Sequence, residues 1–179
     1  MIKSKQDYEY YLECDRKAIN TKRTKPRMYS DSIWKWTRLL RKLEYIKNCK
    51  KGLIGKISYN YYRLKFNKAS KKLGFSIGIN VFGPGLAIFH YGTIIVNSSA
   101  RIGKNCRLYN GVNIARGVVV GDNCYIAPGV KILADVSLSD NLQIGANAVV
   151  SKSFEEPNMT IAGVPAKKIS DKGSRHVTD

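Results

Sequence analysis

The chain has 179 residues, of which 44% are hydrophobic and 25% are charged, values that fit one ordinary domain with a short appendage. This composition excludes a large multidomain protein and a chain that is disordered throughout. No apolar run approaches the roughly 20 residues of a membrane-spanning helix, and the N-terminus lacks the apolar stretch of a secretory signal. We therefore expect a cytoplasmic protein.

The positive charge is concentrated in the first part of the chain. The formal net charge is +18, and residues 1–75 hold 21 basic and 6 acidic residues against 10 and 7 in residues 76–179. Such a field suits a solvated helical surface, and it also suits nucleic acid, an anionic membrane or a phosphorylated substrate. Charge alone does not choose among these partners.

Residues 1–75 are predicted to form a basic α-helical region. A short helix covers residues 7–18, and a basic linker that contains Pro26 follows at residues 20–29. The aromatic residues of this region are expected to form a helical core and a cap on the rest of the chain, rather than a surface for stacking bases.

Two longer helices follow the linker. Asp31 or Ser32 is predicted to cap the first of them, which presents apolar residues at spacings of three and four and ends near Gly52. The second is predicted over residues 53–73, where lysines and arginines alternate with apolar residues, and Gly74 ends it.

A six-residue repeat of apolar positions begins at Ile102, and it can be extended back over the preceding residues in two ways. Val96 and Ala100 occupy its apolar positions, but the next step back places His90 on the inner side. The pattern can instead slip to Ile88 and Ile94, which turns His90 outward near a corner. We favour the slip because a buried histidine needs polar partners that this tract does not supply.

A six-residue period dominates the second part of the chain. In steps of six, one position is aliphatic nine times in succession: Ile102, Leu108, Ile114, Val120, Ile126, Ile132, Leu138, Ile144 and Val150. Three residues after each of these stands Asn, Asp, Gly or Ser, types that tolerate tight turns. The pattern predicts a solenoid in which each hexapeptide forms one short strand and one corner, and three sides complete a coil.

Residues 18 positions apart should then stack at the spacing of neighbouring strands, about 4.8 Å. Cys106 is thereby placed against Cys124, and apolar packing of the two thiols is favoured over a disulfide. The four cysteines form no C-x-x-C pair and there are only two histidines, so no metal site is expected.

Two motifs join the repeat in suggesting a family. The tract GPGLAIFHYG at residues 83–92 and the closing AGVPAK at residues 162–167, together with the repeat, resemble serine acetyltransferases, and most closely their capsule and exopolysaccharide branch. The resemblance implies an all-β, left-handed parallel β-helix over residues 76–170, which follows the helical region, and it leaves residues 171–179 as a polar tail. It also implies a homotrimer with active sites between subunits.

The resemblance further implies transfer of an acetyl group from acetyl-CoA to a hydroxyl. His90 matches the family's general base, and an imidazole with a reference pKa of about 6.5 can accept a hydroxyl proton near neutral pH. Small and basic residues, expected on one stacked face and at the C-terminal turn, match positions that hold CoA: Ala115, Arg116, Pro128, Ala146, Ala162, Gly163, Lys167 and Lys168.

Two departures from serine acetyltransferases concern the acceptor. Their acidic residue before the catalytic histidine is Phe89 here, and their loop with a second histidine is absent between Ile114 and Val120. The main hypothesis is therefore a sugar O-acetyltransferase of surface polysaccharide biosynthesis. The residues expected to bind the sugar are aromatic or carry amides: Phe89, Tyr91, Tyr109, Asn110 and Asn113.

Two other hypotheses stay open. One is a serine O-acetyltransferase of cysteine biosynthesis, and the other is a solenoid scaffold whose basic arm binds nucleic acid or a membrane. For the enzyme we expect no nucleic-acid partner, but we do expect association with the inner face of an anionic membrane through the basic region. Residues 1–30 are expected to be dispensable for transfer to a small acceptor.

Overall fold

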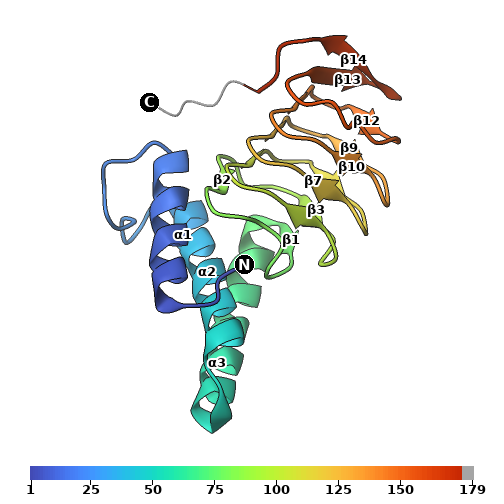
Figure 1. Cartoon of the computed structure of the whole chain (residues 1–179). Helices are drawn as coiled ribbons and strands as arrows, with labels where there is room; N and C mark the ends of the chain where they lie inside the picture. The colour runs from blue at the N-terminus through green and yellow to red at the C-terminus, as the bar shows by residue number, and fades with distance from the viewer. Residues whose placement is uncertain (175–179) are drawn as a thin grey trace.

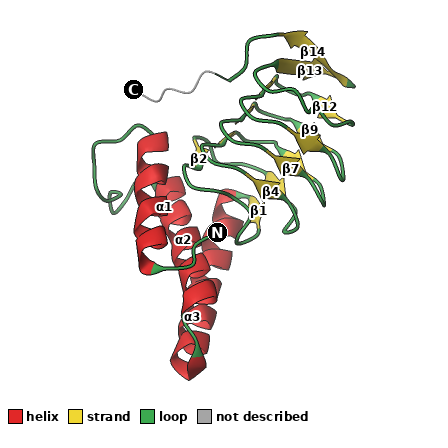
Figure 2. Ribbon diagram, viewed as in Figure 1, coloured by secondary structure: helices red, strands yellow, loops and turns green. Residues whose placement is uncertain are grey.

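The computed structural model describes residues 1–174 and consists of three helices followed by a parallel β-solenoid (Figure 1). The predicted fold class, a hexapeptide β-helix with an N-terminal α-helical region, is confirmed. Figure 2 shows the helices gathered at the end of the solenoid that comes first in the chain. His176 and the end of the predicted tail lie outside the described residues.

The helices α1 (Lys5–Ala18), α2 (Ser32–Cys49) and α3 (Gly52–Leu73) lie close to their predicted positions. The first begins two residues earlier than expected because the Ser4 hydroxyl accepts a hydrogen bond from the Asp7 N–H at 2.9 Å. Gly74 ends α3 as predicted, in the left-handed conformation with φ of 79°.

One detail at the start of α2 differs from the expectation. Asp31 holds the N-cap position without a side-chain cap bond, because its carboxylate binds the guanidinium of Arg23 and the backbone N–H of Arg27. At the other end, Gly52, which was expected to end or follow the helix, follows α2 and begins α3.

The solenoid is built from short strands that form three sheets, one for each side of the coil. The sheet orders are β1-β3-β6-β9-β12, β10-β7-β4 and β14-β13-β11-β8-β5-β2. The strands are β1 (Phe75–Ile77), β2 (Ala87–Ile88), β3 (Ile94–Val96), β4 (Arg101–Ile102), β5 (Arg107–Leu108), β6 (Asn113–Ile114), β7 (Val119–Val120), β8 (Tyr125–Ile126), β9 (Lys131–Ile132), β10 (Ser137–Leu138), β11 (Gln143–Ile144), β12 (Val149–Val150), β13 (Thr160–Gly163) and β14 (Ala166–Ser170).

The predicted inner ladder is confirmed. All nine aliphatic residues are at most 4% exposed, and residues 18 positions apart pair in parallel, as Leu108 does with Ile126 and Ile126 with Ile144. Upstream, Ile88 and Ile94 are buried and His90 is exposed. The slipped register is therefore the correct alternative.

Asparagines at the corners stabilise the stack. Asn105, Asn123 and Asn141 adopt positive φ between 53° and 59°, where an amide side chain is better tolerated than most others. The Asn105 amide donates to the Asn123 amide oxygen at 2.9 Å, and Asn123 donates to Asn141 at 3.0 Å. The turn positions of the hexapeptide thus bond from coil to coil.

Cys106 and Cys124 lie in the solenoid core, and both are free thiols. Burial raises the pKa of Cys106 well above its ordinary value and that of Cys124 to about 11. Both thiols are therefore protonated near neutral pH and pack as small apolar groups.

Arg41 joins the helices to the first coil. Its fully buried guanidinium donates to Asp15 at 2.8 and 3.2 Å and to Glu44 at 3.0 Å. It also donates to the backbone carbonyls of Phe82 at 3.0 Å and Gly83 at 2.7 Å. Although burial opposes the charged form, the two carboxylates raise the pKa of Arg41.

The structure argues against the expectation that residues 1–30 are dispensable. Ile2 and Asp15 are at most 2% exposed, and the Asp15 carboxylate accepts the N–H groups of Gly85 and Leu86 at 2.9 Å each. Removing the segment would leave Arg41 without one of its two carboxylates and would open the core.

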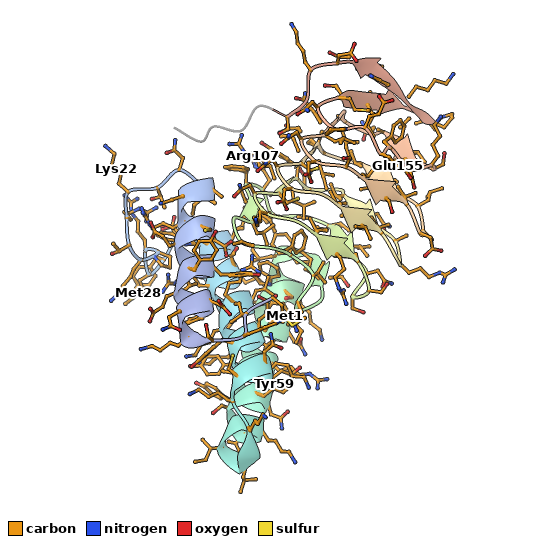
Figure 3. The ribbon with its side chains drawn as sticks, in the orientation of Figure 1. Met1, Lys22, Met28, Tyr59, Arg107 and Glu155 are labelled. Atoms are coloured by element: carbon orange, nitrogen blue, oxygen red, sulfur yellow. The ribbon has the colours of Figure 1, made fainter. Side chains whose placement is uncertain are left out.

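The aromatic core predicted for the helices forms only in part. Trp36 packs against Phe66 and Phe75, with ring centroids 5.4 and 5.0 Å apart. In contrast, Tyr10 of α1 and Tyr61 of α3 are 56% and 51% exposed. The hairpin of α2 and α3 extends beyond the solenoid, as the position of Tyr59 shows in Figure 3.

Replacing Ile126 with Asp should prevent soluble folding, because an unpaired carboxylate would lie between Leu108 and Ile144 at a cost of several kcal/mol. The matched control is Val119→Asp, since Val119 is 47% exposed on β7. Thermal unfolding and gel filtration of both variants check this. An Ile126→Asp variant that melts like the wild type would contradict the register.

Replacing Arg41 with Ala should lower the free energy of unfolding by about 3–5 kcal/mol, because it leaves two carboxylates buried without their cation. The control is Arg116→Ala, whose pair with Asp135 is exposed and should contribute less than about 1 kcal/mol. Urea denaturation at pH 7 measures both losses. Equal losses would mean that the buried network does not stabilise the junction.

Candidate active site

The turn that carries His90 is two residues longer than the turns stacked beside it. Ile88 pairs with Leu108, 20 residues later, whereas Val96 pairs with Ile114, 18 residues later. The two additional residues therefore lie between Ile88 and Val96. They push the chain out from the regular corner, and His90 is exposed there.

The end of α3 anchors this turn. The N–H of Gly92 donates to the carbonyl of Leu73 at 2.9 Å, and that of Ile94 donates to the carbonyl of Gly74 at 3.1 Å. A Cβ on Gly74 would lie 2.9 Å from the Gly92 carbonyl oxygen, so this close approach needs glycine. The helical region thus positions the His90 turn.

Aromatic rings stack beside His90. The Phe89 and Tyr109 ring centroids are 5.7 Å apart, those of His90 and Tyr109 are 6.0 Å apart, and Tyr125 continues the row at 5.2 Å from Tyr109. Burial, followed by the hydrogen bond with Tyr125, raises the pKa of Tyr109, so its phenol is neutral near pH 7. Phe89 and Tyr109, two of the aromatic residues expected to bind the acceptor, therefore lie side by side.

An open cavity of about 550 Å³ lies in front of His90. Four other residues line it: Tyr91, Tyr109, Asn110 and Pro128. None of them is acidic. Within residues 1–174, the imidazole of His90 forms no hydrogen bond, and no group of three His, Cys, Asp or Glu side chains could hold a metal ion. The arrangement offers a histidine, two phenols and an amide to a neutral ligand.

Pro128 and Ala146 continue the edge of the solenoid that starts at this cavity. Asn110, Pro128 and Ala146 are successively 18 residues apart, and backbone bonds connect their corners: Gly129 N–H to the Asn110 carbonyl at 3.0 Å and Asn147 N–H to the Pro128 carbonyl at 2.9 Å. A narrow edge with small side chains therefore leads away from His90.

The C-terminal hairpin closes the same sheet. Ala162 and Gly163 lie in β13, and Ala162 pairs with Lys167 of β14. The Lys168 ammonium binds Asp171 at 2.7 Å and Glu156 at 3.2 Å, and these carboxylates raise its pKa. Lys167, the other lysine of the hairpin, is exposed and forms no such ion pair within the described part of the chain.

Three predicted site residues lie elsewhere. Asn113 is in β6, and Ala115 and Arg116 occupy the corner after it, where Arg116 is 3.5 Å from Asp135. The predicted place of Ala115 and Arg116 on one stacked face with Pro128 is wrong for a single chain, because stacking requires a separation of 18 residues and Ala115 and Pro128 are only 13 apart. The three residues line a different cavity.

Sequence reasoning missed the contribution of the helical region. A second cavity, of about 540 Å³, lies between the helices and the His90 turn and is lined by Trp34, Phe89 and Tyr91 among others. The spacing of its apolar residues alone predicts that Trp34, like the other aromatic residues of this region, belongs to the helical core. The interruption of the repeat at His90 could have indicated this contribution, because an enlarged turn needs neighbours outside the repeat.

Comparisons with known proteins agree with this architecture. Residues 99–134 match the family model described as bacterial transferase hexapeptide, six repeats, and none of the curated proteins matches the chain. The serine O-acetyltransferase of Brucella melitensis is similar in structure, with a TM-score of 0.71 and 21% identity over 94% of this chain and 69% of that one.

Two further structures contain ligands. Serine acetyltransferase of Neisseria gonorrhoeae in complex with serine gives a TM-score of 0.72 and 22% identity over 93% of this chain and 71% of that one. Serine acetyltransferase of Brucella abortus in complex with coenzyme A gives 0.72 and 21% over 96% and 71%. The predicted similarity to serine acetyltransferases thus holds for the fold, and residues 99–134 carry the hexapeptide repeat of bacterial transferases.

Proposed function

We propose that this chain is an acetyl-CoA-dependent O-acetyltransferase in which His90 is the general base. The observation that carries the proposal is the position of His90, exposed on the enlarged turn at the head of the Asn110, Pro128 and Ala146 edge. A histidine beside a cavity suits proton removal, because a neutral alcohol is a weak nucleophile until a base accepts its proton.

The proposed reaction needs one proton carrier. The His90 imidazole accepts the hydroxyl proton while the acceptor oxygen bonds to the acetyl carbon. When the bond from carbon to sulfur then breaks, the imidazolium returns the proton to the departing sulfur. The N–H groups of the solenoid corners are candidate donors to the oxyanion formed in between.

Acetyl-CoA would supply the activated acetyl group as a thioester. The edge formed by Pro128, Ala146, Ala162 and Gly163 fits an extended pantetheine arm, since none of these side chains is large. Lys167 suits the phosphates, whereas Lys168 is already paired with two carboxylates. Structures similar to this chain include complexes with CoA, which supports this co-substrate.

Ala115 and Arg116 enter this proposal through a second copy of the chain. They lie on another side of the solenoid from Pro128. In a homotrimer, one side of a subunit faces a different side of its neighbour. A CoA site between subunits would therefore combine the His90 edge of one copy with the Arg116 corner of the next.

Serine is the acceptor that the comparisons favour over a sugar. The similar structures are called serine acetyltransferases, and two of them are complexes with serine. This supports the serine hypothesis of the sequence analysis and gives no support to a role in polysaccharide biosynthesis. L-Serine is accordingly the first acceptor to test.

A sugar hydroxyl is the second candidate, and a specific observation favours it. An amino acid carries an ammonium group, which a carboxylate would normally bind, and the cavity at His90 is lined by no acidic residue of this chain. Its aromatic and amide groups instead match a neutral acceptor. A screen of L-serine and bacterial sugars, with release of CoA as readout, ranks the acceptors by kcat/KM.

Peripheral binding to an anionic membrane is proposed for α3. Its residues Leu53, Ile54 and Leu64 are 71–82% exposed, and the helix contains lysines and an arginine but no acidic residue. Such a combination is typical of helices that lie on anionic bilayers. Within residues 1–174, none of the helices has the length and apolar character needed to cross a membrane.

Replacing His90 with Ala should lower kcat by about two to four orders of magnitude without changing thermal stability, as expected for the loss of a general base from an exposed position. The matched control is His176→Ala, which changes the other histidine of the chain and should leave kcat unchanged. Steady-state kinetics and circular dichroism measure both properties. Near-normal turnover of a folded His90→Ala variant would remove His90 from this role.

The triple variant Leu53→Ser, Ile54→Ser and Leu64→Ser should no longer sediment with vesicles that contain phosphatidylglycerol. The wild type should sediment with them at low salt but not at high salt, because each basic residue contributes about 1 kcal/mol of attraction that salt screens. The control variant Met28→Ser and Tyr29→Ser changes exposed residues outside α3 and should still sediment. A wild type that stays in the supernatant contradicts the proposal.

A further inference from the structure

The side chain of Asn110 is exposed, lines the same cavity as His90, and forms no hydrogen bond within the described residues. Asparagines at other corners of the solenoid bond to one another, as Asn105 does with Asn123 and Asn123 with Asn141, at 2.9 and 3.0 Å. Asn110 lies outside that ladder. Its amide therefore keeps two N–H donors for a ligand.

The stacking of the coils explains why this amide is unpaired in the described part of the chain. Pro128 and Ala146 follow Asn110 at the same corner, each 18 residues after the last, and neither side chain contains a hydrogen-bonding atom. On the other side lies Gly92 of the His90 turn, where a Cβ would be 3.4 Å from the Asn110 Cβ. Both neighbours of the Asn110 side chain thus leave its amide without a partner.

Backbone hydrogen bonds hold the Asn110 corner in place. The N–H of Gly111 donates to the carbonyl of Thr93 at 2.7 Å, and the N–H of Gly129 donates to the carbonyl of Asn110 at 3.0 Å. The first bond connects this corner to the His90 turn, and the second connects it to the next coil. A donor held in place before reaction stabilises a developing charge well, because it needs no reorganisation.

Other donors around the cavity are engaged, missing or less well held. The phenol of Tyr109 is hydrogen-bonded with Tyr125, and Pro128 has no backbone N–H. Tyr91 also lines the cavity, but it is 75% exposed, so packing does not fix its ring. Asn110 is therefore the neutral side-chain donor that is both unengaged and attached to a fixed corner.

Asn110 also lies on the side of His90 from which the acetyl group would come. It begins the edge of Pro128 and Ala146, which fits the pantetheine arm, whereas Phe89 lies on the side of the helices. An acetyl carbonyl that arrives along this edge would meet the Asn110 amide as its carbon comes next to His90.

We propose that Asn110 is a second catalytic residue, whose amide N–H donates to the oxyanion formed during acetyl transfer. As the acceptor oxygen bonds to the acetyl carbon, one electron pair of the C=O bond moves onto the carbonyl oxygen, and Asn110 hydrogen-bonds that charge. When the pair returns, the bond from carbon to sulfur breaks and the sulfur takes the proton that His90 carries. The amide keeps its own protons throughout. This inference rests on the proposed O-acetyltransferase function and supplies a named side chain for the oxyanion.

Replacing Asn110 with Ala or with Asp tests this role. Both variants lose the N–H donors, and Asp keeps the size of the side chain while placing a negative charge beside the oxyanion. With the acceptor that the screen ranks first, each should lower kcat by about two to three orders of magnitude, the loss expected for one oxyanion donor. KM for the acceptor and for acetyl-CoA should stay nearly unchanged. The matched control is Asn60→Ala, which changes an exposed asparagine of α3 and should leave kcat and KM unchanged.

Hydrolysis of acetyl-CoA without an acceptor separates this role from acceptor binding. Attack of water on the thioester passes through the same oxyanion, so both Asn110 variants should also slow the release of CoA in buffer alone. A variant that raises KM for the acceptor but leaves kcat and this hydrolysis unchanged would overturn the inference. A loss of kcat in Tyr91→Phe together with a normal kcat in Asn110→Ala would overturn it as well.

A His90→Ala variant separates this inference from the proposed function. If His90→Ala loses transfer while Asn110→Ala keeps it, the oxyanion donor fails and the proposed base stands. If Asn110→Ala loses transfer and hydrolysis while His90→Ala keeps near-normal turnover, the proposed base fails and the oxyanion donor stands. Circular dichroism and thermal unfolding of each variant show whether the fold is retained, as expected for two exposed residues.

Discussion

The buried ion pair network around Arg41 is the interaction on which the arrangement of helices and solenoid depends. Arg41 is fully buried and balances two carboxylates, Asp15 of α1 and Glu44 of α2. The excess negative charge is met by backbone N–H groups of the first coil, from Asn80 to Glu44 at 2.7 Å and from Gly85 and Leu86 to Asp15. Every member of the network therefore has partners on more than one element.

Such a network determines where the helices dock more than how tightly they do. Buried ion pairs are expensive to desolvate, and apolar residues of the same volume often stabilise a protein as well. An apolar contact would, however, tolerate sliding of the helices along the coil, whereas the network fixes the segment from Asn80 to Leu86 to two helices. This segment leads directly into β2 and the His90 turn, so the position of His90 follows from the docking.

The repeat could be predicted from sequence because its rule is local: an inward aliphatic residue and a turn residue recur every six positions, and residues such as Ile126 are buried as expected. The slip at His90 could be predicted because a histidine does not fit that rule. The partners of Arg41 could not, since Asp15 lies 26 residues away and a basic residue on an amphipathic helix is normally solvent-exposed. The unpaired N–H of Trp34 could not be predicted either, because the spacing of Trp34 fits a core helix and nothing in the sequence marks an unpaired donor.

The regular solenoid and its junction with the helices suit different parts of the proposed site. A regular solenoid edge repeats the same small corners, and the positions Pro128 and Ala146 are suited to a long, uniform group such as a pantetheine arm. Recognition of a particular acceptor needs an irregular surface, which a repeat cannot provide without breaking its register. Here the break is the two-residue enlargement at His90, and the helices held by Arg41 supply the walls around it. In the proposed reaction, the donor side is therefore a property of the repeat, and the acceptor side is a property of the junction.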